Sequence, residues 1–498
     1  MSVNPKLEKF PFQLKPYQHQ LDALKKGWGD NAFALFMEMG TGKSKVLIDN
    51  VSLLASSGRI DFCLVIAPKG VYKNWTNIEL PKHMPEHMPY RVITWVANPN
   101  KAQQEELHSV KETYEGMTFF VMNIEALSSK KGQMAAEWLG KKFGGRGLIA
   151  IDESTTIKNP KAKRTKAMIK VSHLFNYRRI LTGSPVTQSP LDLYAQCEAL
   201  GPRTLGFESY YAFQNRYAVI NKRQMGAHAF QQIVGYKNVE ELTEKIDEFS
   251  FRVRKKDTLD LPEKVYTVRY IQLTDDQATK YNDIRNEAMT LLDSGDLVST
   301  PSVMTQMLRL QQILSGHIKT DEGDVVGVQS NRPDAVMDIL EEASGKVIIW
   351  SRFRYDIQQL EELINSKLGP GTCGSYYGDT DDEARANLVR DFQDPDSSVR
   401  VFIGNPQTAG YGLTLTEATT VIYYANDFNL ETRIQSEDRC HRIGQKNTVT
   451  YIDLISEKTI DEKIVGALRK KIEISAKTLG EEAQEWLKLD PKSKGAST

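Results

Sequence analysis

A glycine-rich stretch near the amino terminus, Met37-Glu-Met-Gly-Thr-Gly-Lys-Ser44, constrains this chain more than any other feature. It follows an apolar run at residues 33–37 that predicts a buried strand, and it precedes a predicted helix at residues 45–54. A loop between strand and helix with glycines at two nearby positions lets backbone N–H groups surround an anion. The alternative is an ordinary glycine turn, because Met37 stands where the usual phosphate-loop pattern has its first glycine. The predicted nucleotide-binding residues are Gly40, Thr41, Gly42, Lys43, which would reach the outer phosphates, and Ser44, which would bind Mg²⁺.

Length, charge and cysteine content limit the function classes. The chain has 498 residues, more than one hydrophobic core usually supports, so two or three domains are expected. Lysine plus arginine and aspartate plus glutamate both number 64, so any nucleic-acid contact must come from a local basic stripe. The four cysteines lie far apart, which favours a reducing compartment and argues against a zinc site. Because the sequence shows no signal-peptide pattern and no apolar run near ~20 residues, we expect a cytoplasmic protein with no membrane association.

Regularly spaced apolar runs predict the architecture of the first half. Short runs of this kind are typical of strands buried on both faces, and helical patterns lie between them. This alternation predicts a doubly wound parallel sheet, which binds its ligands at the carboxyl ends of the strands. The runs lie at residues 33–37, 62–67, 117–122, 147–151 and 179–182.

Two carboxylates, Asp152 and Glu153, end the run at residues 147–151. Carboxylates at the end of an apolar strand are unfavourable unless they hold a cation or a proton. Asp152 fits a Mg²⁺ ligand, direct or through water, and Glu153 fits the group that polarises an attacking water. The alternative is a helix N-cap followed by an acidic first-turn residue.

Other polar residues of the first half are weaker candidates. Gln18 lies ahead of the phosphate loop and has the planar amide that adenine recognition needs, although a surface turn that opens a helix fits equally well. Polar residues after these β-strands would contact the phosphates of a bound nucleic-acid strand, or would couple that nucleic acid to the nucleotide site. The alternative for the lysines is that they are only solvated, as lysines on loops usually are. These residues are Lys69, Lys73, Asn74, Asn123 and Thr182.

A second set of apolar runs, at residues 346–350, 398–403, 420–424 and 449–454, predicts a second sheet with no phosphate loop of its own. Polar segments follow its strands and contain Arg352, Thr408 and Gly412. Arg439 and Arg442 are three positions apart, hence on one face if that segment is helical. A guanidinium that reaches a γ-phosphate from another domain stabilises charge in the transition state, so one sheet would hold ATP and the other would supply arginines. The alternative is a surface helix whose arginines pair with Glu437 and Asp438.

The predicted domain organisation follows from these two sets of strands. Residues 251–256, a short basic cluster, are predicted to cross between the two lobes. The predicted parts are a first lobe at 1–255 with a helical protrusion at about 186–250, a linker with a helical protrusion at 256–330, a second lobe at 331–456, a bracing helix at 457–480 and a polar tail at 481–498.

With these motifs in order, the chain resembles the Swi/Snf-type ATPases of helicase superfamily 2 over about residues 12–475. Many ordered matches carry the resemblance, and the His-Arg-Ile-Gly-Gln ending of the last one is the most specific. The matches are Tyr17-Gln18, Met39–Ser44, Ala67-Pro68, Asn74-Trp75, Asp152-Glu153, Ile157–Asn159, Leu181–Pro185, Leu261–Lys264, Gly410–Leu415 and Gln435–Gln445.

The resemblance implies an α/β fold of two tandem RecA-like lobes, each a mostly parallel sheet flanked by helices, with a helical bridging region. It also implies ATP hydrolysis stimulated by double-stranded DNA, and translocation along the duplex. By position, Gln18 would read adenine, Lys43 and Ser44 would hold phosphates and Mg²⁺, Asp152 and Glu153 would serve metal and water, and Arg439 and Arg442 would be arginine fingers. Gly412 is counted with the nucleotide-binding residues, and Lys69, Asn123, Thr182, Arg352 and Thr408 would lie near the DNA or the coupling path.

Three departures from the family pattern concern DNA contacts rather than ATP chemistry. Ser154-Thr155 replace the common Ala/Gly-His, Thr414 replaces an asparagine, and Asn405-Pro-Gln replaces Ser-Thr-Arg. The chain shows no recognisable chromatin reader, zinc finger or nuclease module, so it resembles bacterial or bacteriophage members.

We expect a monomeric, DNA-dependent ATPase that translocates on double-stranded or branched DNA in the cytoplasm or nucleoid. Replication, recombination or transcription proteins are candidate partners. The alternatives are a strand-separating DNA or RNA helicase and a scaffold that only clamps nucleic acid.

Overall fold

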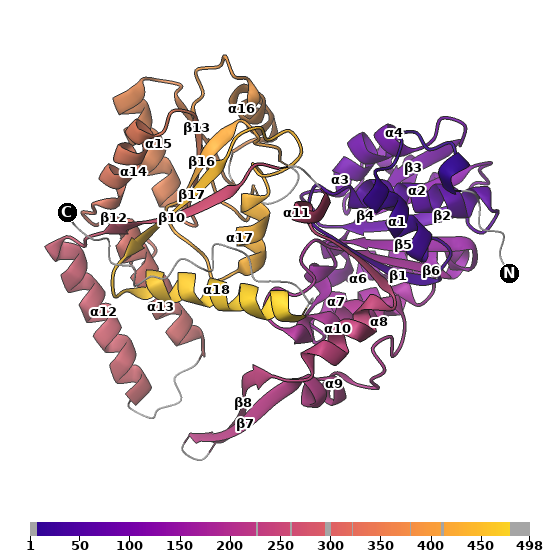
Figure 1. Ribbon diagram of the computed structural model, residues 1–498, viewed down its shortest axis with the longest axis horizontal. Coiled ribbons are helices and arrows are strands. Elements are labelled where there is room, and N and C mark those ends of the chain that lie inside the picture. The colour runs from indigo at the N-terminus through magenta and orange to yellow at the C-terminus, as the bar shows by residue number, and fades with distance from the viewer. Residues whose placement is uncertain are drawn as a thin grey trace. The chain divides into compact units, whose positions relative to one another are not determined.

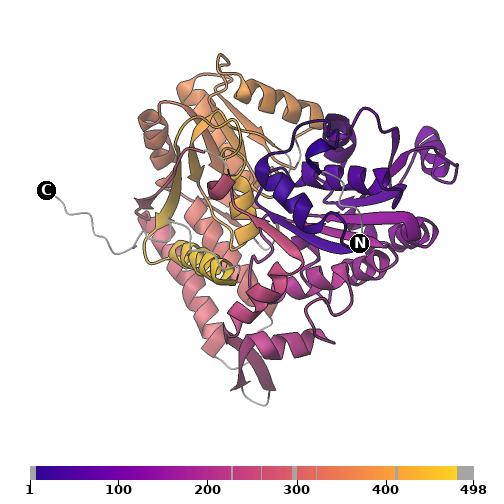
Figure 2. The same cartoon turned by 45° about the vertical axis from the view of Figure 1, so that its right-hand side comes forward.

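The computed structural model describes residues 7–225, 228–258, 261–293, 300–320, 322–378, 380–409 and 413–478. The chain divides into two compact units between Asp260 and Leu261. Unit 1 precedes this boundary, apart from the tip of one hairpin, and unit 2 follows it (Figure 1, Figure 2). Residues 261–330, predicted as a linker with a helical protrusion, therefore group with unit 2.

Unit 1 is built on a seven-stranded sheet in which all the described neighbours are parallel. Its order is β3-β4-β2-β5-β6-β1-β9, so the strand before the phosphate loop, β1, lies between β6 and β9. The five predicted strands are present. Residues 251–256, predicted as a crossing segment, instead contribute most of the edge strand β9 and the start of a short helix. The strands are β1 Ala32–Met37, β2 Phe62–Ala67, β3 Tyr90–Thr94, β4 Met117–Asn123, β5 Gly147–Asp152, β6 Tyr177–Leu181 and β9 Ser250–Val253.

Helices cover both faces of this sheet because its central strands are apolar on both sides. In β2, Phe62 and Leu64 pack into the core under α6, α7 and α8, whereas Cys63 and Val65 pack into the core under α1 and α2. The helices are α1 Gln18–Gly27, α2 Lys43–Ser56, α3 Tyr72–Asn74, a π-helix Trp75–Glu79, α4 Leu80–His83, α5 Lys101–Ser109, α6 Lys130–Phe143, α7 Lys163–Ser172, α8 Leu193–Leu200, α9 Tyr210–Tyr217, α10 Val239–Asp247 and α11 Lys255–Thr258. Short 3₁₀ helices span Leu7–Lys9, Ile124–Ser128, Gly144–Arg146, Ser154–Ile157 and Pro190–Asp192.

The segment 186–250, predicted as a helical protrusion, also contains a two-stranded hairpin. Helices α8, α9 and α10 lie in this segment, and the hairpin separates α9 from α10. Its strands are β7 Ala218–Met225 and β8 His228–Tyr236 (Figure 1).

Unit 2 is built on a six-stranded sheet in the order β10-β17-β16-β13-β15-β14, again with parallel neighbours. The four predicted strands form its centre, and the edge strands β10 and β14 were not predicted. The strands are β10 Lys264–Ile271, β13 Lys346–Trp350, β14 Cys373–Tyr376, β15 Val401–Gly404, β16 Ala418–Tyr423 and β17 Val449–Ser456, with a small antiparallel pair, β11 His317–Lys319 and β12 Val325–Gly327.

Helices of unit 2 cover both faces of the sheet, so each face has a hydrophobic core. An additional hydrophobic cluster joins α12, α13 and α18, where Ile464 and Leu468 of α18 pack with Ile313. None of the described helices is both long and apolar enough to span a membrane. The helices are α12 Asp275–Asp293, α13 Thr300–Ser315, α14 Arg332–Glu342, α15 Arg354–Leu368, α16 Asp382–Gln393, α17 Leu430–Glu437 and α18 Ile460–Thr478. The predicted α/β class, with two tandem parallel sheets flanked by helices, is confirmed.

Candidate nucleotide-binding site

The glycine-rich loop joins β1 to α2, as predicted. Gly40 and Gly42 have φ angles of 85° and 90°, a left-handed conformation that side-chain-bearing residues rarely adopt. At Gly42 a Cβ atom would also lie 2.2 Å from Nε2 of Gln20, so a larger residue would displace the Gln20 side chain. The Thr41 hydroxyl and backbone N–H both donate to the Glu38 carbonyl, at 2.8 and 3.2 Å, which closes the loop into a compact turn.

Helix α1 supports this loop through a glutamine that the sequence analysis did not select. Gln20 is 3% exposed, and its amide donates to the Thr41 carbonyl at 3.1 Å. Nε2 of His19 lies 2.9 Å from the same carbonyl. Gln18, predicted to read adenine, is exposed, and its amide donates to Asp22 at 2.8 Å. The adenine role of Gln18 stays a prediction, whereas Gln20 is the glutamine that the structure ties to the loop.

Asp152 ends β5 and lies within the electrostatic reach of Lys43, the first residue of α2. Burial raises the pKa of the Asp152 carboxyl, and the Lys43 ammonium and two hydrogen bonds oppose that rise. The indole Nε1–H of Trp75 donates to Asp152 Oδ2 at 2.9 Å, and the Glu153 backbone N–H donates to Oδ1 at 3.0 Å. The structure thus brings the predicted Lys43 and Asp152 together and adds Trp75, whose ring is 2% exposed.

Glu153 is buried in a strained backbone conformation. It is 7% exposed and has a φ angle of 48°, in the left-handed region that non-glycine residues adopt uncommonly and that recurs at active sites. Its side chain makes no capping bond to the short helix that follows, so the N-cap alternative is not what is observed. Instead, the Thr182 hydroxyl donates to Glu153 Oε2 at 3.3 Å, and the Ser184 N–H donates to that hydroxyl at 3.2 Å. Thr182 therefore links the Leu181–Pro185 segment to the predicted water-polarising carboxylate.

The Leu181–Pro185 segment also packs directly on the phosphate loop. A Cβ atom at Gly183 would lie 3.1 Å from the Met39 nitrogen, so the two backbones approach closely. Arg252 of β9 donates through Nη1 to the carbonyls of Phe36 and Gly183, at 3.1 and 2.8 Å. This arginine was treated only as part of a basic cluster in the sequence analysis, because no local pattern connects it to either carbonyl.

The polar groups present fit Mg²⁺. Among the described residues, no group of three or more His, Cys, Asp or Glu side chains could hold a metal by itself. Mg²⁺ in nucleotide sites is usually held by one or two protein oxygens together with phosphates and waters, so a sparse ligand set is expected. Each Asp152 oxygen accepts one hydrogen bond, which orients the carboxylate and leaves lone pairs for a cation. Ser44 and Asp152 are the residues that would hold it.

In unit 1, the side chain of Glu125 connects two of the segments that carry predicted nucleic-acid contacts. Glu125 Oε2 accepts from the Lys69 N–H at 3.1 Å and from the Asn123 amide at 3.2 Å. The side chains of Lys69 and Lys73 are exposed, whereas Thr182 is 1% exposed. Asn74 ends α3 and is partly buried. Thr182 is thus too buried to contact a ligand at the surface.

In unit 2, Asn405 connects two further candidates. Its amide nitrogen donates to the Arg352 carbonyl at 2.8 Å, and its Oδ1 accepts from the Thr408 N–H at 3.3 Å. Arg352 Nη1 donates to Gln311 Oε1 at 2.9 Å. Asn405, noted as a departure from the family pattern, therefore holds Arg352 and Thr408 near each other. Gly412, predicted to bind nucleotide, lies outside the described residues.

Arg439 and Arg442 lie together, but not on a helix face. Helix α17 ends at Glu437, and both arginines belong to the turn that follows. Their Nη1 atoms donate to the same acceptor, the Leu413 carbonyl, at 3.4 and 3.2 Å. Arg439 is 1% exposed and Arg442 is partly buried. The alternative pairing with Glu437 is not what the structure shows, because Glu437 pairs with Arg433 and Lys264.

Comparisons with known proteins agree with this geometry. The SNF2-related domain family matches residues 29–317, and the helicase conserved C-terminal domain family matches residues 331–444. The chain is 26% identical over 480 residues to an uncharacterised ATP-dependent helicase of Mycoplasma genitalium, which covers 94% of this chain and 42% of that protein. It is 26% identical over 449 residues to the human DNA annealing helicase and endonuclease ZRANB3, covering 89% and 38%. A solved SWI2/SNF2 ATPase core of Sulfolobus solfataricus in complex with dsDNA is 25% identical, with 94% and 95% covered and a TM-score of 0.41.

The chain thus spans about two fifths of the length of these two curated relatives. One is bacterial and the other eukaryotic, so the likeness to bacteriophage members stays a prediction. The SNF2-related family alone matches more than half of the chain. With two tandem parallel sheets flanked by helices, the chain belongs to the SNF2-related family of helicase-like, ATP-hydrolysing enzymes.

Proposed function

We propose that this chain is an ATPase that double-stranded DNA stimulates and that translocates along the duplex, remodelling DNA structures or protein–DNA complexes. One observation carries the proposal: the predicted phosphate, metal and water residues lie at the carboxyl ends of three adjacent strands, β1, β6 and β5. Lys43 follows β1, Thr182 follows β6, and Asp152 ends β5. Strand ends of a parallel sheet are where such folds bind ligands and do chemistry.

Each residue has a distinct role in the proposed hydrolysis. The backbone N–H groups of the loop and the Lys43 ammonium hold the phosphates. Trp75 and the Glu153 N–H fix the orientation of Asp152. Glu153, held by Thr182, orients and polarises the attacking water. Bound Mg²⁺ would neutralise phosphate charge, and Arg439 and Arg442 would add positive charge where the transition state needs it.

The proposed DNA contact rests on the loops after β2 and β4. Lys69 and Lys73 are exposed, and Glu125 joins the backbone of Lys69 to Asn123. The human relative is named as a DNA annealing helicase, which supports DNA as the nucleic acid.

ATP hydrolysis measured against single-stranded, duplex, forked and four-way DNA, and against RNA, tests this function. We expect duplex-containing DNA to raise the turnover most. Equal turnover with and without nucleic acid would contradict the proposal and would favour a scaffold. The names of the two relatives favour a second candidate, a strand-separating helicase. Displacement of a triplex strand without unwinding of tailed duplexes supports the translocase, and unwinding of those duplexes supports the helicase.

Salt should weaken DNA binding steeply. Contacts of lysine and arginine with phosphates release counterions, so log Kd changes with log salt in proportion to the number of contacts. We expect Lys69→Ala combined with Lys73→Ala to reduce the slope by about two contacts. Fluorescence anisotropy of a labelled duplex over a salt series measures the slope of log Kd against log salt. A flat dependence in the wild type would show that the protein does not track the backbone.

Trp75→Phe should weaken the use of Mg²⁺. Phenylalanine fills most of the space of the indole but removes the N–H donor to Asp152 Oδ2. A hydrogen bond to a charged group contributes about 1.5–3 kcal/mol, so the Mg²⁺ concentration for half-maximal ATPase should rise roughly tenfold or more.

The matched control is Trp95→Phe in the same unit. Trp95 is 7% exposed, and its indole nitrogen has no hydrogen-bond partner among the described residues, so only packing changes. A Mg²⁺ titration of ATPase activity compares the two variants. If both shift alike, the hydrogen bond from Trp75 does not orient Asp152.

A further inference from the structure

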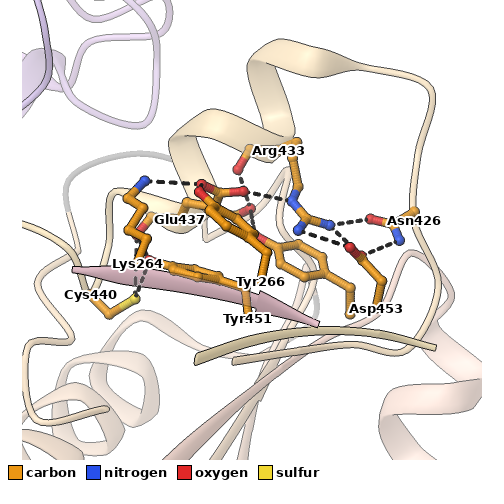
Figure 3. A network of polar contacts seen from close by, with 10 residues as sticks. Lys264, Tyr266, Asn426, Arg433, Glu437, Cys440, Tyr451 and Asp453 are labelled. Carbon is orange, nitrogen blue, oxygen red and sulfur yellow. Dashed lines mark hydrogen bonds and ion pairs between the residues drawn. The ribbon is translucent and has the colours of Figure 1, made fainter. Parts of the chain in front are cut away.

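Unit 2 holds a buried network of polar side chains centred on Glu437, the last residue of α17 (Figure 3). Glu437 is 3% exposed. Its Oε2 accepts from Lys264 Nζ at 3.0 Å and from the Tyr266 hydroxyl at 2.7 Å, and its Oε1 accepts from Arg433 Nε at 2.8 Å. Burial alone would raise the pKa of Glu437, but the charges of Lys264 and Arg433 outweigh it and lower that pKa to about 2. The carboxylate is therefore ionised and has three donors.

Arg433 extends the network to the centre of the sheet. Its Nη1 lies 2.5 Å from Asp453 Oδ1 on β17 and 2.8 Å from Asn426 Oδ1, and its guanidinium lies 3.4 Å from the Tyr423 ring centroid. Helix α17 is thus fastened to β17 through Arg433 and to β10 through Glu437 (Figure 3). Two fastenings to different strands restrain rotation of the helix about its axis.

The turn that carries Arg439 and Arg442 begins directly after this carboxylate. The backbone carbonyl of Glu437 accepts from the Tyr451 hydroxyl at 3.1 Å, from the Cys440 thiol at 3.3 Å and from the His441 N–H at 3.2 Å. The position of Glu437 therefore fixes the start of the turn, and with it the direction in which both guanidinium groups leave the backbone.

The other end of the network lies next to the boundary between the units. Lys264 is the first residue of β10, three positions after Leu261, where the main segment of unit 2 begins. His441 Nε2 lies 2.8 Å from the Pro262 carbonyl, a second link between this segment and the turn. Strand β10 is an edge strand that pairs with β17 in the described part of the sheet, and Lys264 and Tyr266 add contacts to α17 through Glu437.

We infer that Lys264 and Tyr266 are positioning residues for Arg439 and Arg442, and that they connect the segment joining the two units to these arginines. The inference rests on the proposed function, because it assigns these arginines to the hydrolysis of ATP. A displacement of the joining segment acts first on the start of β10. From there the ammonium and hydroxyl groups transmit it to Glu437 and to the turn.

Lys264→Met and Tyr266→Phe test this in the full chain, because each removes the polar atom and keeps most of the side chain. Two variants of the same sheet are matched controls. Lys346 is the first residue of β13, and its ammonium donates to the Asp394 carbonyl at 2.6 Å. Lys346→Met removes this ammonium. Tyr424→Phe removes a buried hydroxyl that donates to the Ser315 carbonyl at 2.9 Å. For each variant, kcat and KM for ATP with duplex DNA are measured together with Tm.

Thiol labelling provides a second measurement, which does not require ATPase activity. All four cysteines are buried, and Cys440 bonds to Glu437 within the turn. Buried thiols react slowly, so site-resolved labelling of Cys440 reports loosening of the turn, and Cys373 serves as an internal control in the same unit.

For Lys264→Met and Tyr266→Phe we expect kcat to fall roughly ten- to hundredfold, the scale of a small misplacement of catalytic groups, with KM changed less than about twofold. Cys440 labelling should accelerate, and Cys373 labelling should not. The controls should keep kcat at equal or larger losses of Tm. Equal kcat losses in all four variants, or unchanged Cys440 labelling, would overturn the inference. A wild type without ATPase activity would instead contradict the proposed function, and Cys440 labelling alone would then decide whether the network holds the turn.

Discussion

Glu153→Gln should still bind ATP but hydrolyse it roughly 10²–10⁴-fold more slowly than the wild type, the usual contribution of general acid–base catalysis. Glutamine has nearly the same size as glutamate, and its amide oxygen can still accept from the Thr182 hydroxyl, which lies 3.3 Å from Glu153 Oε2. The backbone at φ 48° is unchanged, so the loop keeps its shape. Only the ability to polarise a water is lost, because an amide is far less basic than a carboxylate.

Binding and turnover must be measured separately to test this variant. Equilibrium binding of a fluorescent ATP analogue should be unchanged within about twofold, and single-turnover hydrolysis should be slow. Glu137→Gln is the matched control, since Glu137 lies on α6 of the same unit and pairs with Lys170 at 2.8 Å on the surface. Wild-type turnover in Glu153→Gln would show that another group polarises the water.

In the two large sheets, the sequence patterns predicted the central strands and missed the edge strands, and they also missed the pairs β7–β8 and β11–β12. The missed strands β3, β9, β10 and β14 are the first and last strands of the two sheets. Central strands are buried on both faces and along both sides, so they show as continuous apolar runs. Edge strands have a free side and carry polar residues: β10 alternates from Lys264 to Arg269, and β9 contains Arg252. A search for continuous apolar runs therefore finds the central strands of a parallel sheet and overlooks its edge strands.

Within the candidate site, too, some residues were predictable from the local sequence, whereas others are recognisable only in the tertiary structure. Asp152 and Glu153 were found because they end or directly follow an apolar strand, and Lys43 was found because it closes the glycine-rich loop after another such strand. Trp75 and Arg252 were missed as site residues because their partners are remote in sequence. The indole of Trp75 bonds to a carboxylate 77 positions away, and Arg252 bonds to a carbonyl 69 positions away. Residues that orient the site, rather than forming it, are recognised only once the strands lie side by side.

Spacing alone also gave an incomplete picture of Arg439 and Arg442. A separation of three positions places both on one face only if the segment is helical, and α17 stops at Glu437. The backbone then turns toward the sheet, where the Leu415 N–H donates to the Arg439 carbonyl at 2.9 Å. The two guanidinium groups converge because they share the Leu413 carbonyl, a tertiary contact that the spacing does not contain.

Arg442→Ala should lower kcat for ATP by roughly 10³–10⁵, the contribution of an arginine finger to phosphoryl transfer. Because such a group acts mainly on charge that develops in the transition state, KM should change far less than kcat. Arg442 is a cleaner test than Arg439. Arg439 is 1% exposed and donates to the carbonyls of Gln435 and Leu413, so its truncation also removes buried hydrogen bonds and destabilises the unit.

The control for Arg442→Ala is Arg390→Ala, on α16 of the same unit, where the side chain is exposed beside Asp391. It removes the same charge from the unit, so a general electrostatic effect on DNA or ATP binding would appear in both variants. Steady-state ATPase with saturating duplex DNA compares them, and Tm verifies that both are folded. If Arg442→Ala keeps kcat within about tenfold of the wild type, the charge of Arg442 does not reach the phosphates in the transition state. The proposed function would then lose the arginine finger on which its chemistry is argued.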